Sequence, residues 1–328
     1  MNMLTPDGFE GPSFISTDLA ATKRFWVDYL GGVLRAEASR DGSLPCQILL
    51  GEVVLEFYAA HEAERPGAGG PNHQHYAWDI EPGEYDLWAE RAQTWQVHTL
   101  RVTAHAAIHG LSLFWDDPDG YHMELAAHYT NAEDMAEAKR LRAELIERLT
   151  SVPEGTMSST ALGPPLRPVG IMSHFTNSAP DMAAAMHFWI DFMGGELYSE
   201  SPAINQVFIA GVLVDLFGQR PNGPAVPPAP GSSIRQQYRF RVAPQALEQW
   251  VERAERWQVR MTMLEQKALL RLTLVAHGAG GYHVGLVACY ESVEALQRDA
   301  ERLCERLARL DAIAKPFTAE NGLSIVSH

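Results

Sequence analysis

The chain has 328 residues, of which 46 % are hydrophobic, enough for two domains with cores of their own. Its formal net charge of −15 argues against nucleic acid or an anionic membrane as the main partner. Three cysteines without paired spacing, Cys46, Cys289 and Cys304, favour a reducing cytoplasm. The N-terminus does not read as a signal peptide, and no apolar run reaches the roughly 18 residues that span a bilayer.

Short strands and amphipathic helices alternate along the first half. Residues 11–17 read as a strand, and Asp18 can cap a helix that ends at Gly31-Gly32. Further elements are expected in the order strand, strand, strand, helix, at 47–50, 53–58, 73–80 and 85–95. Residues 132–149 have a helical period, and residues 151–168 have the composition of a linker.

The residues from His105 to Glu124 predict two strands joined by a tight turn. L-S-L-F-W and Y-H-M-E-L alternate in hydrophobicity, and D-D-P-D-G between them is typical of a turn. Alternation places Tyr121 and Met123 on one face and His122 and Glu124 on the other. Because a carboxylate within a strand is costly to bury unless it is paired or binds a metal, Glu124 is either exposed to solvent or a ligand.

The pattern repeats after the linker with an offset of 159 to 163 residues. F-W-V-D-Y-L-G-G (25–32) recurs as F-W-I-D-F-M-G-G (188–195), and W-A-E-R-A-Q-T-W-Q-V (88–97) recurs as W-V-E-R-A-E-R-W-Q-V (250–259). Each copy contains the order strand, helix, several strands twice, which gives four βαβββ units. We therefore expect an α+β protein of two duplicated domains, 1–150 and 169–328, joined by the linker 151–168.

The four units resemble those of the vicinal oxygen chelate superfamily, which includes glyoxalase I, extradiol dioxygenases, and fosfomycin and bleomycin resistance proteins. The resemblance implies that two units form a cupped mixed sheet around a divalent metal, with ligands from their first and last strands. Pairing the second and third units brings together His75, Glu124, His174 and Asp215. Pairing the first and fourth brings together Gly11, Glu56, Gln237 and Gly285.

One of these sets is complete and the other is nearly empty. The resemblance therefore implies a single metal site between the two copies, with His75, Glu124 and His174 as ligands. Asp215 would be a fourth ligand or a neighbour of the ligands. Two histidines and one carboxylate with open positions suit Fe(II), although the same donors also accept Mn, Ni or Zn.

The run Thr103-Ala104-His105, seven residues, Leu113-Phe114, Asp117-Pro118, Gly120 and Glu124 is similar to a motif of extradiol ring-cleavage dioxygenases. This resemblance implies a catechol- or hydroquinone-like substrate, O₂, and an acid/base histidine at His105 or His109. The motif has a tyrosine where this chain has Phe114, which cannot donate a hydrogen bond. A donor such as Tyr121, His109 or Tyr238 would then replace it, with Phe114 and Tyr238 beside the substrate.

Two other functions stay open. One is a glyoxalase-like isomerase or lyase that uses all four residues, Asp215 included, around Ni or Zn. The other is a metal-free small-molecule binding protein, as in bleomycin resistance. The loop 220–231 could close over the site, and the resemblance to the superfamily implies a homodimer.

Overall fold

The computed structural model describes residues 4–61, 64, 75–105, 109–152, 157, 166, 168–201, 204–218, 233–278 and 280–313, and only the backbone of 99–101, 105, 169 and 171. Four βαβββ units follow one another in this chain, as the sequence repeat predicted. Among the described helices, none is long and apolar enough to cross a membrane.

The first two units and the helices after them have the following elements: β1 (Gly8–Ser16), α1 (Leu19–Lys23), η1 (Arg24–Tyr29), β2 (Val33–Ala36), β3 (Cys46–Leu50), β4 (Val53–Ala59), β5 (His75–Ile80), η2 (Pro82–Glu84), α2 (Tyr85–Thr94), β6 (Thr99–His105), β7 (Gly110–Asp116), β8 (His122–His128), α3 (Ala132–Leu141) and α4 (Ala143–Thr150). The single helix expected over 132–149 is thus two helices. The break lies at Arg142, whose backbone leaves the helical region with φ −102° and ψ 9°.

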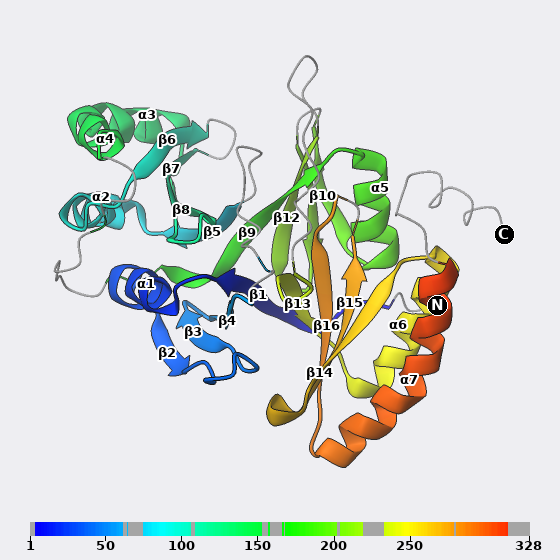
Figure 1. Ribbon diagram of the computed structural model, residues 1–328. Helices are drawn as coiled ribbons and strands as arrows, with labels where there is room; N and C mark the ends of the chain where they lie inside the picture. Colours follow the sequence, from blue (N-terminus) through cyan, green and yellow to red (C-terminus); the bar gives the residue numbers. More distant parts are fainter. Residues whose placement is uncertain are drawn as a thin grey trace.

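The second half repeats this order: β9 (Val169–Ala179), α5 (Met182–Met186), η4 (His187–Phe192), β10 (Glu196–Glu200), β11 (Ile204–Ile209), β12 (Val212–Gly218), β13 (Gln237–Arg241), η5 (Pro244–Ala246), α6 (Leu247–Trp257), β14 (Met261–Gln266), η6 (Lys267–Leu269), β15 (Arg271–His277), β16 (His283–Cys289) and α7 (Val293–Ile313). In Figure 1, α6 and α7 lie side by side against the strands of the last unit.

Each of the two eight-stranded sheets takes strands from both halves of the chain (Figure 1). One sheet has the order β14-β15-β16-β13-β1-β4-β3-β2 and combines the first and fourth units. The other has the order β10-β11-β12-β9-β5-β8-β7-β6 and combines the second and third. We call them the outer-unit sheet and the inner-unit sheet. This is the crossed pairing that the distribution of ligand residues predicted.

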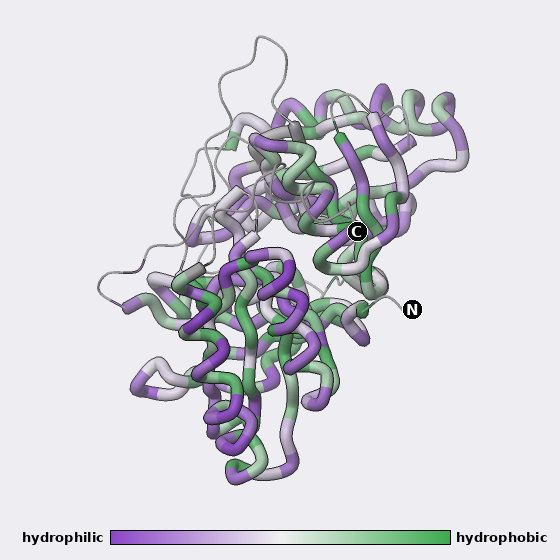
Figure 2. The backbone as a smooth tube through the Cα atoms, turned by 90° about the vertical axis from the view of Figure 1, so that its right-hand side faces the viewer, coloured by the Kyte–Doolittle hydropathy of each residue, from purple (hydrophilic) through white to green (hydrophobic). Residues whose placement is uncertain are grey.

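Aromatic side chains from the first strands of the units pack between the two sheets. Phe14 of β1 meets Tyr76 of β5 with ring centroids 4.8 Å apart, and Phe175 of β9 stacks on Tyr238 of β13 at 3.9 Å. In Figure 2, hydrophobic and hydrophilic residues follow one another at short intervals along the described chain. Because side chains alternate across a strand, the neighbours of these rings point to the opposite, concave face of each sheet.

Local sequence signals explain how the repeated helices begin and end. The side chain of Asp18 accepts hydrogen bonds from the backbone N–H groups of Ala20 and Ala21, and Asp181 caps the equivalent helix in the second half. The helical segment of the first unit stops before Gly31, which adopts φ +76°, a conformation that favours glycine.

The turn between β7 and β8 is fixed by Asp117. Its Oδ1 accepts hydrogen bonds of 2.9 Å from the backbone N–H groups of Asp119 and Tyr121, and its Oδ2 accepts one of 3.0 Å from the indole of Trp26. The predicted turn in D-D-P-D-G is therefore confirmed, and it sets the register in which Phe114 faces Glu124.

Candidate metal centre

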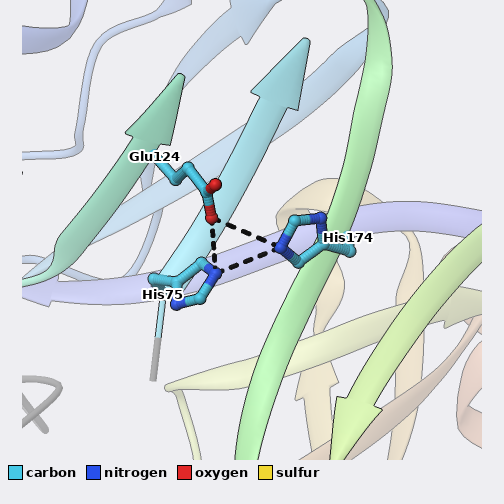
Figure 3. A group of neighbouring side chains, drawn as sticks. All are labelled: His75, Glu124 and His174. Carbon is cyan, nitrogen blue, oxygen red and sulfur yellow. Dashed lines mark hydrogen bonds and ion pairs between the residues drawn. The ribbon is translucent and has the colours of Figure 1, made fainter. Parts of the chain in front are cut away.

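Three polar side chains meet on the concave face of the inner-unit sheet. His75 lies on β5, Glu124 on the adjacent β8, and His174 on β9, on the other side of β5 (Figure 3). Nε2 of His75 lies 3.0 Å from Nε2 of His174 and 2.7 Å from Oε2 of Glu124, which is 3.4 Å from Nε2 of His174. The three predicted ligand residues are thus brought together, one of them from beyond the linker.

The triangle formed by these three atoms has the size that one metal ion requires. Two ligand atoms about 2.1 Å from an ion and at right angles to one another lie about 3.0 Å apart. The three observed separations, 2.7, 3.0 and 3.4 Å, scatter around this value. Among the described residues, this is the only group of three or more acidic, histidine or cysteine side chains that could hold an ion. The donor set therefore fits a divalent metal.

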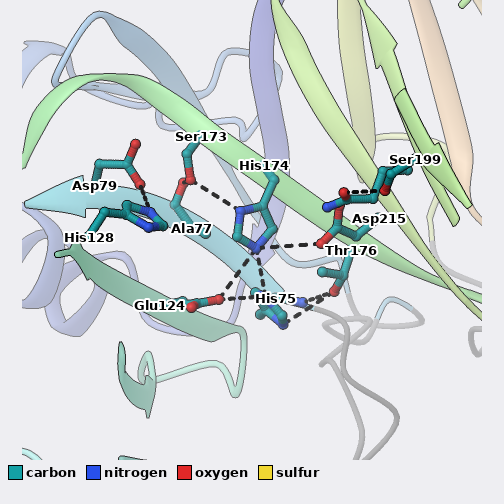
Figure 4. Close-up of polar contacts among 11 residues, drawn as sticks. His75, Ala77, Asp79, Glu124, His128, Ser173, His174, Thr176, Ser199 and Asp215 are labelled. Atoms are coloured by element: carbon teal, nitrogen blue, oxygen red, sulfur yellow. Dashed lines mark hydrogen bonds and ion pairs between the residues drawn. The ribbon is translucent and has the colours of Figure 1, made fainter. Parts of the chain in front are cut away.

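Hydroxyl groups fix which ring nitrogen each histidine presents. Oγ1 of Thr176 lies 3.3 Å from Nδ1 of His75 and also accepts the backbone N–H of His75 at 2.7 Å. Oγ of Ser173 lies 3.1 Å from Nδ1 of His174 (Figure 4). Such partners orient a ligating imidazole and select its tautomer, so both Nε2 atoms point to the common centre.

Burial and mutual charge set the protonation of the three groups. Burial alone would raise the pKa of Glu124, but the charge of His75 and hydrogen bonds from both histidines hold that pKa well below its usual range. Burial lowers the pKa of His75 despite the opposing charge of Glu124. Burial also acts to lower the pKa of His174, but the hydrogen bond and charge of Glu124 and the charges of Asp215 and Asp79 raise it to about 9. In the metal-free protein, His174 therefore carries the proton at neutral pH.

Asp215 lies beside the triangle rather than within it. Its Oδ2 is 4.0 Å from Nε2 of His174. Its Oδ1 accepts a 2.8 Å hydrogen bond from Gln206, whose own carbonyl oxygen accepts one of 2.6 Å from Ser199. This chain of hydrogen bonds holds the carboxylate near the ligands at the edge of the site (Figure 4).

The corresponding centre of the outer-unit sheet holds a buried ion pair. By strand and register, Gln237 stands in the place of His75, Gly285 in that of Glu124 and Gly11 in that of His174. Glu56, in the place of Asp215, contacts Nη1 of Arg239 at 2.6 Å and Nη1 of Arg271 at 2.5 Å. A β-carbon added at Gly285 would lie 1.8 Å from Oε1 of Gln237, so this centre is closed by its own side chains.

Arg239 is the residue that fills the outer-unit centre. It faces Gly11 in the sheet, as Ala77 faces His174 in the inner-unit sheet. Its Nε donates to the carbonyl of Gly11 at 3.2 Å, and its Nη2 donates to the carbonyl of Val54 at 2.7 Å. The guanidinium therefore lies between the backbone of Gly11 and Val54 and the carboxylate of Glu56, where it supplies positive charge.

Two predicted hydroxyl donors do not reach the centre. Tyr121 exchanges 3.1 Å hydrogen bonds with the backbone of Ile15, and Tyr238 donates to Asn177 at 2.9 Å. Both rings belong to the aromatic core, so their proposed roles at the substrate are corrected here. Because side chains alternate along an extended chain, both phenol rings point away from the concave face that carries the ligands.

The other predicted residues are placed as follows. Phe114 packs edge-on against His75, with ring centroids 5.3 Å apart, and so lies at the site. His109 is in the β6–β7 turn with φ +49°, and its carbonyl accepts the N–H of Tyr129. The side chain of His105 and the loop 220–231 lie outside the described residues, so the expectations for them stay predictions.

The sequence analysis missed the residues that support the ligands: Ser173, Thr176, Gln206 and, in the other sheet, Arg239. A signal existed for one of them. Gln47 donates to Glu56 at 2.8 Å as Gln206 donates to Asp215, and the two pairs have the same repeat offset of 159.

Comparison with known proteins supports the fold described above. Residues 12–125 match the model of the glyoxalase/bleomycin resistance protein/dioxygenase superfamily. The fold is similar to that of a candidate dioxygenase from Bacillus subtilis, with a TM-score of 0.61 and 12 % identity over 96 % of this chain and 98 % of that one. It is also similar to glyoxalase I from Zea mays, with a TM-score of 0.56 and 12 % identity over 90 % and 95 % of the two chains. No curated protein matches the chain.

The family model, the paired βαβββ units and the cupped sheets agree. The family model therefore confirms the resemblance to the vicinal oxygen chelate superfamily over residues 12–125. The similar solved structures confirm the α+β fold expected from the sequence.

Proposed function

We propose that the protein is an Fe(II)-dependent dioxygenase that opens the ring of a catechol- or hydroquinone-like substrate. The observation that carries the proposal is the triangle of two imidazoles and one carboxylate on the concave face of a sheet. Two histidines and a carboxylate with open positions are the donor set of non-haem iron oxygenases. When bound, Fe(II) supplies a redox centre through which the electrons of the aromatic diol reach O₂, so no external reductant is needed.

The chain's own residues would hold and shape this centre. His75, His174 and Glu124 bind the ion, and Thr176 and Ser173 keep the two rings in the required orientation. The single charge of Glu124 leaves the ion with a net positive charge, which favours the binding of an ionised substrate oxygen.

Apolar side chains flank the ligands in the same register, which supports an aromatic substrate. Phe114 is paired with Glu124 on one side, and Leu213 is paired with His174 on the other. Beyond Leu213 lies Phe208, whose side chain is exposed although it is large and hydrophobic. An aromatic ring held at the ion would have apolar surfaces of this kind to contact.

A specific observation also favours a second candidate, a redox-neutral isomerase or lyase of the glyoxalase type with Ni or Zn. Asp215 occupies the last-strand position of the third unit, and Gln206 holds it 4.0 Å from Nε2 of His174. A small movement of this carboxylate would give the ion a fourth protein ligand.

Metal analysis together with oxygen uptake separates these functions. The protein would be purified without oxygen, its metal content measured, and O₂ consumption followed with a panel of catechols and hydroquinones. Iron with substrate-dependent uptake supports the dioxygenase, and nickel or zinc without uptake supports the isomerase or lyase. Protein that binds no divalent ion would contradict both and support a metal-free binding protein.

His105→Ala, assayed in the same way, tests the predicted acid/base histidine. We expect its metal content to match the wild type and its turnover to fall by about two orders of magnitude. A cytoplasmic homodimer is proposed as the working form.

A further inference from the structure

Ser112 on β7 shares the concave face with the metal centre. Leu113 and Trp115 point the other way, where Trp115 packs against Tyr29 with ring centroids 5.7 Å apart. Phe114 points to the ligands and contacts His75, and Ser112 lies two residues before it on the same face. The strand pairing confirms this placement, because Ser112 is opposite Ala126, two residues beyond Glu124.

The hydroxyl of Ser112 is fully buried and makes no hydrogen bond within the described part of the chain. A buried hydroxyl without a partner costs free energy, so it calls for an explanation. Other described residues also carry such atoms, but most are aromatic groups in the core or belong to the outer-unit centre. By strand register, Ser112 is the only described residue of this kind on the concave face of the inner-unit sheet.

The other hydroxyl groups near the centre are already engaged. Thr176 and Ser173 hydrogen bond to the two histidines, and Ser199 donates to Gln206. The phenols of Tyr121 and Tyr238 are bound within the aromatic core. Among the described residues, a ligand at the metal would therefore find one buried hydroxyl still without a partner on this face. Its residue lies diagonally across the strand pair from Glu124, at the usual spacing of roughly 7–8 Å.

We propose that Ser112 is a substrate-binding residue whose hydroxyl donates a hydrogen bond to an oxygen of the metal-chelating substrate. The assignment rests on the proposed function, since it requires a ligand with adjacent oxygens at the ion. It adds a specificity determinant: the substrate carries an oxygen acceptor directed toward β7, and its aromatic body lies between Phe114 and Leu213.

The test compares Ser112→Ala with the wild type, both loaded with metal under nitrogen. The probe is 4-nitrocatechol, a chelator whose absorption changes on binding to a metal. Loss of one hydrogen bond should weaken probe binding by about tenfold. Metal affinity should stay unchanged, and the melting temperature should not fall, because the substitution removes a polar group without a partner.

Thr273→Val provides a matched control. Thr273 occupies the equivalent register in the outer-unit sheet, opposite Val287. It should bind the probe as the wild type does, because its hydroxyl lies on the sheet whose centre is closed by Arg239.

Each outcome decides the assignment. Weaker probe binding by Ser112→Ala, with unchanged metal affinity and no drop in melting temperature, supports it. Equal binding by variant and wild type would overturn it while leaving the proposed function intact. A lower melting temperature would also overturn it, because the hydroxyl would then have a structural partner. If wild-type protein with bound metal did not bind the probe at all, both this assignment and the proposed function would be wrong.

Discussion

Replacing Arg239 by methionine should destabilise the fold without affecting the metal centre. The guanidinium pairs with Glu56, which is fully buried, and it satisfies the carbonyls of Gly11 and Val54. Methionine keeps most of the volume but leaves the carboxylate with Arg271 as its remaining cationic partner. Removing one member of a buried ion pair costs about 3–5 kcal/mol. Because Arg271 stays, we expect the lower end, about 3 kcal/mol.

The pKa of Glu56 shows how strongly its surroundings, with both arginines, stabilise the charged form. Burial would raise that pKa, but the charges of Arg239 and Arg271 lower it from 4.5 to about 2. At about 1.4 kcal/mol per pKa unit, the shift corresponds to about 3 kcal/mol of stability. Since the pKa is depressed in the folded state, this stabilisation is present above pH 4.5 and is lost as the pH falls toward 2. The difference between wild type and variant should therefore shrink in acid.

Urea unfolding of both proteins at several pH values measures the effect. The double variant Arg239→Met/Glu56→Gln should be less destabilised than the single variant, because it contains no unpaired buried charge. Lys23→Met, which removes an exposed pair with Glu37, should change the free energy of unfolding by less than about 1 kcal/mol. A single variant within about 1 kcal/mol of the wild type at neutral pH, or a difference that does not vary with pH, would refute the argument.

Three further predictions concern the metal centre. His75→Ala and His174→Ala should both abolish metal binding in a titration followed by calorimetry. Gln237→Ala, at the equivalent position of the other sheet, should retain it. Metal bound at wild-type affinity by His174→Ala would rule out the crossed site. An ion must displace the proton that His174 holds with a pKa of about 9. Metal affinity should therefore fall about tenfold for each pH unit below that value. An affinity independent of pH would show that this proton is absent. Asp215→Asn should weaken metal binding by about tenfold, because its carboxylate lies 4.0 Å from Nε2 of His174; unchanged affinity would place Asp215 outside the centre.

Local pattern was sufficient for the elements, and the resemblance to the superfamily selected the ligand positions. Strand alternation places His122 and Glu124 on the face opposite Tyr121, and the resemblance to the superfamily identifies His75 and His174 as first-strand positions of the second and third units. The crossed pairing could also be predicted, because only one combination of units collects a full set of donors.

Tertiary structure decided what no local pattern carries. That Arg239 lies in the outer-unit centre depends on its contacts with Gly11, Val54 and Glu56, which are far from it in the chain. Likewise, the sequence alone left Tyr121 and Tyr238 as candidate hydroxyl donors, whereas in the packed sheets both hydroxyls already make hydrogen bonds. Alternation is a property of each strand and can be read from the sequence, but the partner of a buried polar group is set by strands brought together from distant segments.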